Sequence, residues 1–205
     1  MSDSGGFSLA RVLELVAAVD AAMPGGPPIE VAVGGAVAMM QIAPGRLSED
    51  IDAYEASLHP DLAAAVEVVA EREGLDPGWL NNAAAQFGLP VFDVQPEPLY
   101  EGRRLVLRVM EPVTMLLLKL NAGRDKEVND ILLLMDETGF TTEDDLFILI
   151  DSYFEDHPDS NLDRAWMEDT AKVSATLFGA QHWGAGLDPP ESPPSPTPNG
   201  PAPGQ

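Results

Sequence analysis

The chain contains no cysteine among its 205 residues, which excludes disulfide bonds and any nucleophile or metal site built on thiolates. Basic residues are scarce, because 11 lysines and arginines stand against 34 aspartates and glutamates, giving a formal net charge of −23. A surface of this sign repels nucleic-acid phosphates. We therefore expect no DNA partner, and no broad electrostatic capture of RNA.

Long apolar runs are also lacking. No stretch approaches the roughly 18 residues of a membrane helix, and residues 1–6 carry no basic region ahead of an apolar stretch, as a signal peptide would. We therefore expect a cytoplasmic protein with no membrane partner. Residues 184–205 are rich in Pro, Gly, Ser and Thr without apolar periodicity, which predicts a disordered tail.

The remaining sequence predicts an α/β order that gives way to helices, with one core and a small helical annex. We expect a core domain over residues 1–140 and an annex over residues 141–183. Apolar spacing, turn residues and capping residues predict strands over 29–33, 50–54 and 104–110, and helices over 8–23, 36–41, 61–73, 77–87, 112–121, 126–137, 142–154 and 162–178. Asp61 is the expected N-cap of the 61–73 helix, and Thr142 with Asp145 resembles a capping box at the start of the 142–154 helix.

Two aspartates near the start of the chain are the most informative feature. Asp50 and Asp52 flank Ile51 in a predicted strand, so both carboxylates face one side while Ile51 turns to the core. The turn Gly34-Gly35 lies between the 29–33 strand and the following helix, and it would stand beside the aspartates if the two strands pair. A glycine turn that opens a helix can bind phosphates, and paired carboxylates suit Mg²⁺. The alternative is a pair of solvated surface acids.

These residues resemble a known family. Gly34-Gly35 followed by Arg46-x-Ser48-x-Asp50-Ile51-Asp52 looks like the first motif of the DNA-polymerase-β-type minimal nucleotidyltransferases, and most closely that of the AbiEii-like toxins and their small bacterial relatives. Further matches lie in the segments 79–84, 116–124 and 130–131, so the resemblance spans about residues 28–140.

The resemblance implies an α+β fold: a minimal nucleotidyltransferase core with a short mixed sheet flanked by helices, followed by a C-terminal helical region. It implies an enzyme that transfers an NMP from an NTP to an RNA (such as a tRNA) or a protein hydroxyl, with Mg²⁺ or Mn²⁺ as cofactor. By resemblance the protein is the toxin of a toxin–antitoxin or phage-defence system with a cognate antitoxin. A non-catalytic nucleotide-binding or antitoxin-like regulatory protein of the same fold is the alternative.

The resemblance also assigns roles to individual residues. Asp50 and Asp52 are the expected metal ligands and are also counted among the expected catalytic residues. Lys119 and Asp130 are the other expected catalytic residues, with Asp130 or Glu111 as the source of a third carboxylate. The residues expected to bind the nucleotide are Gly34, Gly35, Ser48, Lys119 and Arg124.

Each of these assignments has an ordinary structural alternative. Lys119 either extends along its apolar helix to solvent or reaches into a cleft. Arg124 either grips a phosphate or pairs with Asp125 or Glu127. Asp130 has Lys126 four residues earlier, a spacing typical of an exposed helical ion pair. Ser48 is equally suited to an ordinary turn.

Overall fold

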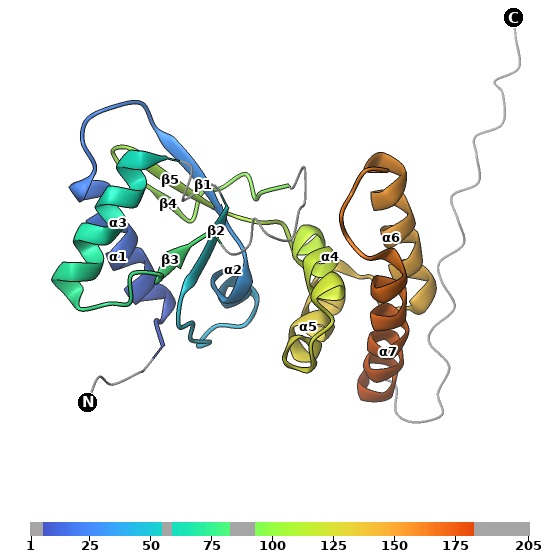
Figure 1. The fold of residues 1–205 in the computed structure, drawn as a ribbon. Coiled ribbons are helices and arrows are strands. Elements are labelled where there is room, and N and C mark those ends of the chain that lie inside the picture. Colours follow the sequence, from blue (N-terminus) through green and yellow to red (C-terminus); the bar gives the residue numbers. More distant parts are fainter. Residues whose placement is uncertain (1–5, 55–58, 83–92, 183–205) are drawn as a thin grey trace, which may run out of the picture.

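The computed structural model describes residues 6–54, 59–82 and 93–182, and its centre is a mixed five-stranded sheet (Figure 1). The described strands lie in the order β3-β2-β1-β5-β4. β1 (Ile29–Val33) pairs antiparallel with β2 (Ile51–Tyr54) and parallel with β5 (Leu105–Val109). The short strands β3 (Leu80–Asn81) and β4 (Tyr100–Glu101) form the two edges.

The pairing of β1 with β2 confirms the arrangement expected from the sequence. The register sets Val33 opposite Ala53, so the residues that follow β1 come beside the start of β2. The three predicted strands are confirmed to within one residue at each end. Their β-branched residues favour extended backbone. The α+β class is thereby confirmed.

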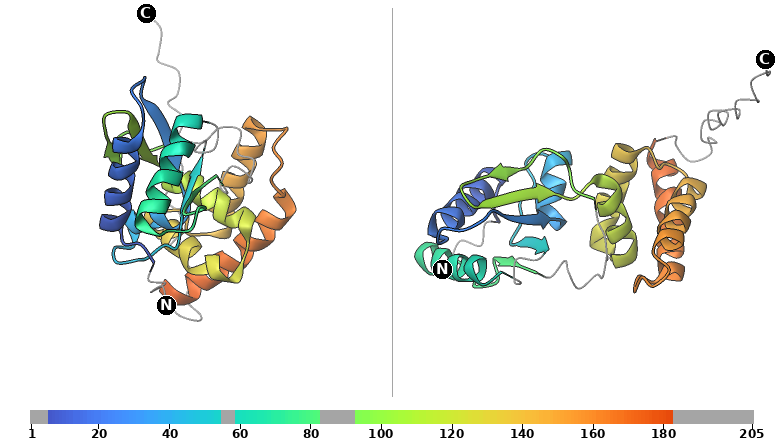
Figure 2. Two further views of the ribbon diagram at one scale, coloured as in Figure 1. Left: turned by 60° about the vertical axis from the view of Figure 1, so that its left-hand side comes forward. Right: turned by 90° about the horizontal axis from the view of Figure 1, so that it is seen from above.

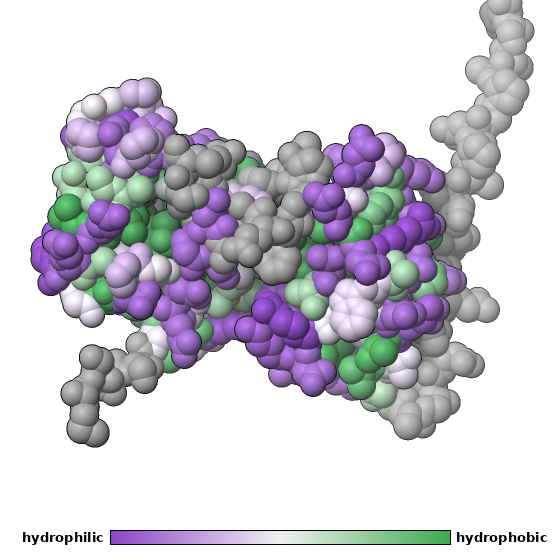
Figure 3. Space-filling model, viewed as in Figure 1, coloured by the Kyte–Doolittle hydropathy of each residue, from purple (hydrophilic) through white to green (hydrophobic). Residues whose placement is uncertain are grey.

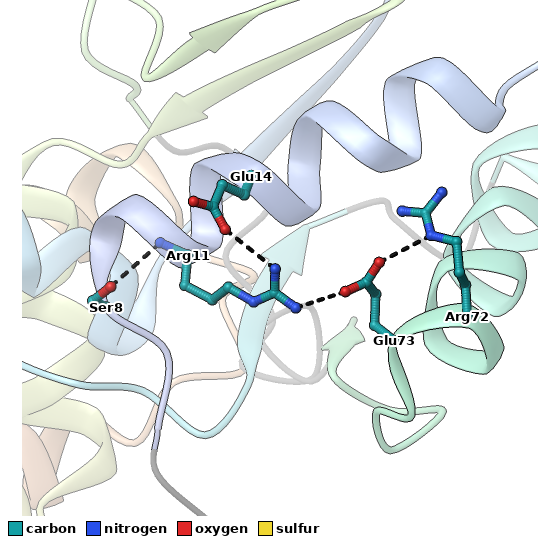
Figure 4. A network of polar contacts seen from close by, with 5 residues as sticks. All are labelled: Ser8, Arg11, Glu14, Arg72 and Glu73. Atoms are coloured by element: carbon teal, nitrogen blue, oxygen red, sulfur yellow. Dashed lines mark hydrogen bonds and ion pairs between the residues drawn. The ribbon is translucent and has the colours of Figure 1, made fainter.

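Two helices pack against each other beside the sheet. α1 (Leu9–Ala22) and α3 (Pro60–Glu73) lie side by side at the end of the molecule away from α4 (Figures 1 and 2). Their exposed edges are joined by Arg11, which pairs with Glu14 of its own helix and with Glu73 of α3 (Figure 4). Exposed pairs of this kind contribute little free energy, so the buried apolar faces hold the two helices together.

Asp20 ties α1 to the segment that enters β5. Its carboxylate accepts hydrogen bonds from the backbone N–H groups of Arg103, Arg104 and Leu105, at 2.7 to 2.8 Å. Burial alone would raise the pKa of Asp20, but these backbone donors outweigh it and the pKa is lowered. The ionised carboxylate therefore fixes where β5 begins.

Two local predictions are wrong. Asp61 was expected to cap the N-terminus of α3, but His59 holds that position and Pro60 starts the helix, because the fixed φ of proline suits a first turn. The helix expected over 77–87 is absent from its described part, where a turn leads through Trp79 into β3. Ile51 donates its backbone N–H to the carbonyl of Trp79, and this extended pairing replaces the helix. Residues 83–92 lie outside the described part of the chain.

The second half of the molecule is helical. It comprises α4 (Pro112–Ala122), the 3₁₀ turn η2 (Asp125–Glu127), α5 (Val128–Thr138), α6 (Glu143–Asp156) and α7 (Arg164–His182). α4 packs against both α5 and α7, and Figure 2 shows these helices grouped at one end of the sheet. The predicted capping box is confirmed, since Thr142 and Asp145 bond each other's backbone N–H groups at the start of α6.

One apolar cluster runs through both halves, from Val12 of α1 to Phe178 of α7. Among the residues that the structure describes, no helix is both long enough and apolar enough to cross a membrane. The tail predicted over 184–205 lies outside the residues that the structure describes.

Candidate functional site

The glycine turn and the second aspartate form one unit. β1 ends at Val33, Gly34 caps α2 (Gly35–Ile42), and the backbone N–H of Gly34 donates to the carbonyl of Asp52 at 3.0 Å. Gly35 has φ of +56°, and a Cβ atom there would lie well inside 3.0 Å of Asp52 Oδ2. Glycine suits this position for two reasons: its φ lies in the left-handed region, and any side chain there would displace the Asp52 carboxylate.

Asp50 stands just before β2 and is held from two sides. The Ser48 hydroxyl donates to its carbonyl oxygen at 2.7 Å, and Asn81 Nδ2 donates to its carboxylate at 3.2 Å. Ile51 is fully buried between the two aspartates, as the strand alternation predicts. Ser48 itself is buried and serves the turn, while Asn81 brings the edge strand β3 into the site.

The pKa of Asp52 is raised above its ordinary value. Burial raises the pKa of Asp52, and the nearby charge of Asp50 raises it further. Lys119, Arg124 and Lys126 act in the opposite direction but do not cancel the shift. A cation placed between the two aspartates would relieve both effects.

A small pocket opens at Asp52. Its volume is about 70 Å³, and its lining comes from the glycine turn, β2, α4 and the residue Arg124 just beyond α4: Gly34, Gly35, Asp52, Met115, Leu118, Lys119, Ala122 and Arg124. Pockets that enclose a whole small molecule have volumes of roughly 300–1,000 Å³. This pocket therefore suits a phosphate group or a hydrated cation, and the rest of a larger ligand would lie outside it.

Lys119 belongs to a buried ionic network rather than to the solvent-exposed surface. Its ammonium pairs with Glu127 and, at 2.8 Å, with Asp130. Glu127 also pairs with Arg124, and Asp130 also pairs with Arg46. The network joins the α2–β2 loop, α4, η2 and α5 behind the pocket. Lys119 lines the pocket, and the two carboxylates fix the orientation of its ammonium.

The structure corrects one interpretation of Asp130. The pairing with Lys126 on an exposed helix face is wrong, because Asp130 is only 1% exposed and faces Arg46 and Lys119. It does not line the pocket, and neither does Glu111, which caps α4. Within the described ranges no cluster of three carboxylate or histidine side chains is placed to hold a metal ion.

The two aspartates still fit a magnesium ion in one respect. Mg²⁺ is commonly held by one or two protein carboxylates, with substrate phosphates and water completing its shell. Asp50 and Asp52 supply this number, and Asp52 faces a pocket that a Cβ at Gly35 would close. Lys119 and Arg124 line the same pocket, so five of the predicted site residues come together there: Gly34, Gly35, Asp52, Lys119 and Arg124. Asp50, Ser48 and Asp130 are not among the residues that line it.

Two contacts of this region were not predicted from the sequence. The expected alternative pairing of Arg124 with Glu127 is confirmed, but Glu127 is only 3% exposed and also pairs with Lys119. Trp166 of α7 packs on the turn at Gly123, next to Arg124. No local spacing signals either role, because Glu127 meets Lys119 across a turn and Trp166 is 42 residues from Arg124 along the chain.

Comparisons of this chain with protein-family models, with curated proteins and with solved structures gave no match.

Proposed function

We propose that the chain is a nucleotidyltransferase of the minimal nucleotidyltransferase fold, which transfers an NMP from an NTP to an acceptor hydroxyl. The observation that supports this most strongly is the pocket itself. It brings a glycine turn at a helix N-terminus, a carboxylate of a closely spaced pair, a lysine and an arginine to one place. Phosphoryl transfer depends on such positioning and charge neutralisation.

Separate groups of the pocket would bind the phosphates and the metal ion. The first turn of α2, from Gly35 onward, offers its backbone N–H groups and the positive end of the helix dipole to a phosphate. Gly34 caps this helix, and its own N–H is bonded to the Asp52 carbonyl. Lys119 and Arg124 neutralise charge on the β- and γ-phosphates from the opposite wall. Asp50 and Asp52 would hold Mg²⁺ or Mn²⁺, which when bound supplies Lewis-acid polarisation of the phosphates.

In the proposed reaction an acceptor hydroxyl attacks the α-phosphorus in line. The new O–P bond forms as the bond from the α-phosphorus to the α,β-bridging oxygen breaks, pyrophosphate leaves, and the proton of the hydroxyl passes to solvent water. Asp130 acts as a positioning residue, because its carboxylate is bound to Arg46 and Lys119 and lies outside the pocket. The acceptor is a hydroxyl of RNA or protein. Because the net charge of −23 repels nucleic-acid phosphates, an RNA acceptor would be held by few contacts to its backbone. Action as a toxin restrained by an antitoxin is the setting that the family resemblance implies.

A second candidate is a non-catalytic nucleotide-binding or regulatory protein. It is favoured by the pairing of Lys119 with two carboxylates and of Arg124 with Glu127. The lack of a third carboxylate at the pocket, within the residues described, supports it as well. Such a protein would bind an NTP and transfer nothing.

Transfer of label from α-³²P NTPs tests the proposal. The full chain is incubated with each NTP, Mg²⁺ or Mn²⁺, and tRNA, other RNA or the protein itself as acceptor. Wild type is compared with Asp50→Asn, Asp52→Asn and the exposed control Asp144→Asn on α6. Label that requires Asp50 and Asp52 but not Asp144 supports nucleotidyl transfer. Transfer that persists in Asp52→Asn contradicts it, and metal-dependent NTP binding without transfer supports the second candidate.

A further inference from the structure

A second and larger pocket lies on the far side of the α4 C-terminus. Its volume is about 230 Å³, and it lies between the turn at Gly123 and Asp125, the start of α5, and α7. Arg124 lines both pockets, so its guanidinium marks the boundary between them. Figure 3 shows apolar surface among polar surface over this helical half of the molecule.

Trp166 forms an aromatic wall of this second pocket. The indole packs directly on the backbone of Gly123, whose φ is +54°, and a Cβ atom there would overlap the ring. The ring is thus fixed against the turn on one side, while the residue stays 48% exposed. An exposed tryptophan whose orientation is fixed by backbone contact is suited to stack a planar ligand.

The rest of the lining completes a slot with a polar rim. Val128, Ile131 and Val173 provide apolar surface. Asp169 stands at the rim, where one of its oxygens accepts from Lys172 at 3.0 Å and the other has no hydrogen-bond partner among the described side chains. Arg124 provides the opposite charge at the side that adjoins the first pocket.

We propose that the second pocket binds a nucleobase that carries an exocyclic amine, stacked on Trp166 with its amine donating to Asp169. A flat aromatic ring suits the apolar walls, and an exocyclic amine can donate to the exposed carboxylate, whereas uracil has no exocyclic amine and offers only its ring N3–H. The assignment rests on the proposed function, since Arg124 would then contact the sugar–phosphate part of the same nucleotide or of its neighbour. The base belongs either to the donor NTP or to the acceptor.

The first test measures binding of nucleosides, which lack phosphates and need no metal. The full chain is titrated calorimetrically with adenosine and with uridine at millimolar concentrations. We expect adenosine to bind more tightly than uridine. Trp166→Ala should weaken adenosine about tenfold or more, the effect of losing one stacking platform. Asp169→Asn alters an exposed side chain and should weaken the preference for adenosine, because an amide oxygen is a weaker acceptor than a carboxylate.

Matched controls alter surfaces away from this pocket. Val68→Ala on α3 truncates an apolar side chain that is 53% exposed, and Asp144→Asn on α6 neutralises an exposed carboxylate. Both controls should bind adenosine as wild type does. Equal adenosine binding by wild type, Trp166→Ala and Asp169→Asn overturns the proposal, as does the absence of adenosine binding.

The second test distinguishes the two sources of the base. If the donor base is bound, Trp166→Ala raises KM for ATP and leaves KM for the acceptor unchanged; if the acceptor base is bound, the reverse holds. Unchanged values for both overturn the proposal. Transfer that persists in Asp52→Asn would refute the proposed function alone, because Trp166-dependent adenosine binding does not involve that residue.

Discussion

The carboxylate of Asp52 occupies the space that a side chain at Gly35 would need. Gly35 lies at the first turn of α2 and Asp52 in β2, and the hydrogen bond from Gly34 N–H to the Asp52 carbonyl keeps the two elements in register. The glycine is therefore required by a tertiary contact as well as by its own positive φ. The site's main acid and its phosphate-facing turn cannot be altered independently.

Gly35→Ala should destabilise the protein more than Gly45→Ala. Both glycines have positive φ, so alanine meets backbone strain at each, but a Cβ at Gly45 would have nothing within 4 Å. We expect Gly35→Ala to lower the free energy of unfolding by about 2–3 kcal/mol and Gly45→Ala by about 1 kcal/mol. Urea unfolding followed by circular dichroism measures the difference.

The excess cost at Gly35 should depend on Asp52. In an Asp52→Ala background the obstructing carboxylate is gone, so Gly35→Ala and Gly45→Ala should cost about the same. If the excess persists in that background, the contact between these two residues is not its cause.

Asp130→Ala should be strongly destabilising. It removes the carboxylate between Arg46 and Lys119 and leaves Glu127 as the only carboxylate of the network for three cations. We expect a loss of about 3 kcal/mol, as for other broken buried ion pairs. Asp125→Ala changes an exposed carboxylate nearby and should cost about 0.5 kcal/mol or less. Equal unfolding midpoints for the two variants would show that the network carries no such weight.

Lys119→Met should separate function from folding. The variant leaves Glu127 with Arg124 and Asp130 with Arg46, so the remaining buried charges balance. We expect a smaller stability loss than for Asp130→Ala. Transfer of an NMP should nevertheless fall about 100-fold or more, because the ammonium at the phosphate pocket is lost. Rates and unfolding curves measured on one preparation test this, and near-normal transfer would exclude a catalytic role for Lys119.

Asp20 should make stability depend on acid pH. The pKa of Asp20 is lowered in the folded chain below its ordinary value of 3.8. Its contribution is therefore complete above that pH and is lost as the pH falls through the folded-state pKa. Wild type should lose more stability than Asp20→Asn between pH 4 and lower values, measured by thermal unfolding across a pH series. Parallel curves for the two proteins would contradict the role of the carboxylate.

The parts of the fold that could be predicted from the sequence are those with local signals. β1, the glycine turn and β2 follow from β-branched runs bounded by glycine and from alternation around Ile51. β3 and β4 have two residues each, too few for periodicity, and their pairing depends on neighbours far along the chain. The helix wrongly expected after Pro77 shows the same limit, because the pairing of Trp79 with Ile51 outweighs local propensity.

The residues of the candidate site also differ in whether local sequence signals predict them. Gly34, Gly35, Asp50 and Asp52 lie within 19 residues and could be predicted as a unit. The surroundings of Asp130 could not, because Arg46 is 84 residues away and Lys126 offered a plausible local partner instead. The contacts of Glu127 with Lys119 and of Trp166 with Gly123 were missed, because they depend on how α4, η2 and α7 pack.

The most direct test of the central claim is a calorimetric titration of the full chain with ATP, with and without Mg²⁺. The pocket at Asp52 is proposed to hold phosphates and a cation together, so wild type and Asp144→Asn should bind ATP more tightly when Mg²⁺ is present. Asp52→Asn should lose that magnesium dependence while remaining folded, since burial already favours an uncharged group there. Magnesium-dependent binding of equal strength in Asp52→Asn would contradict the account.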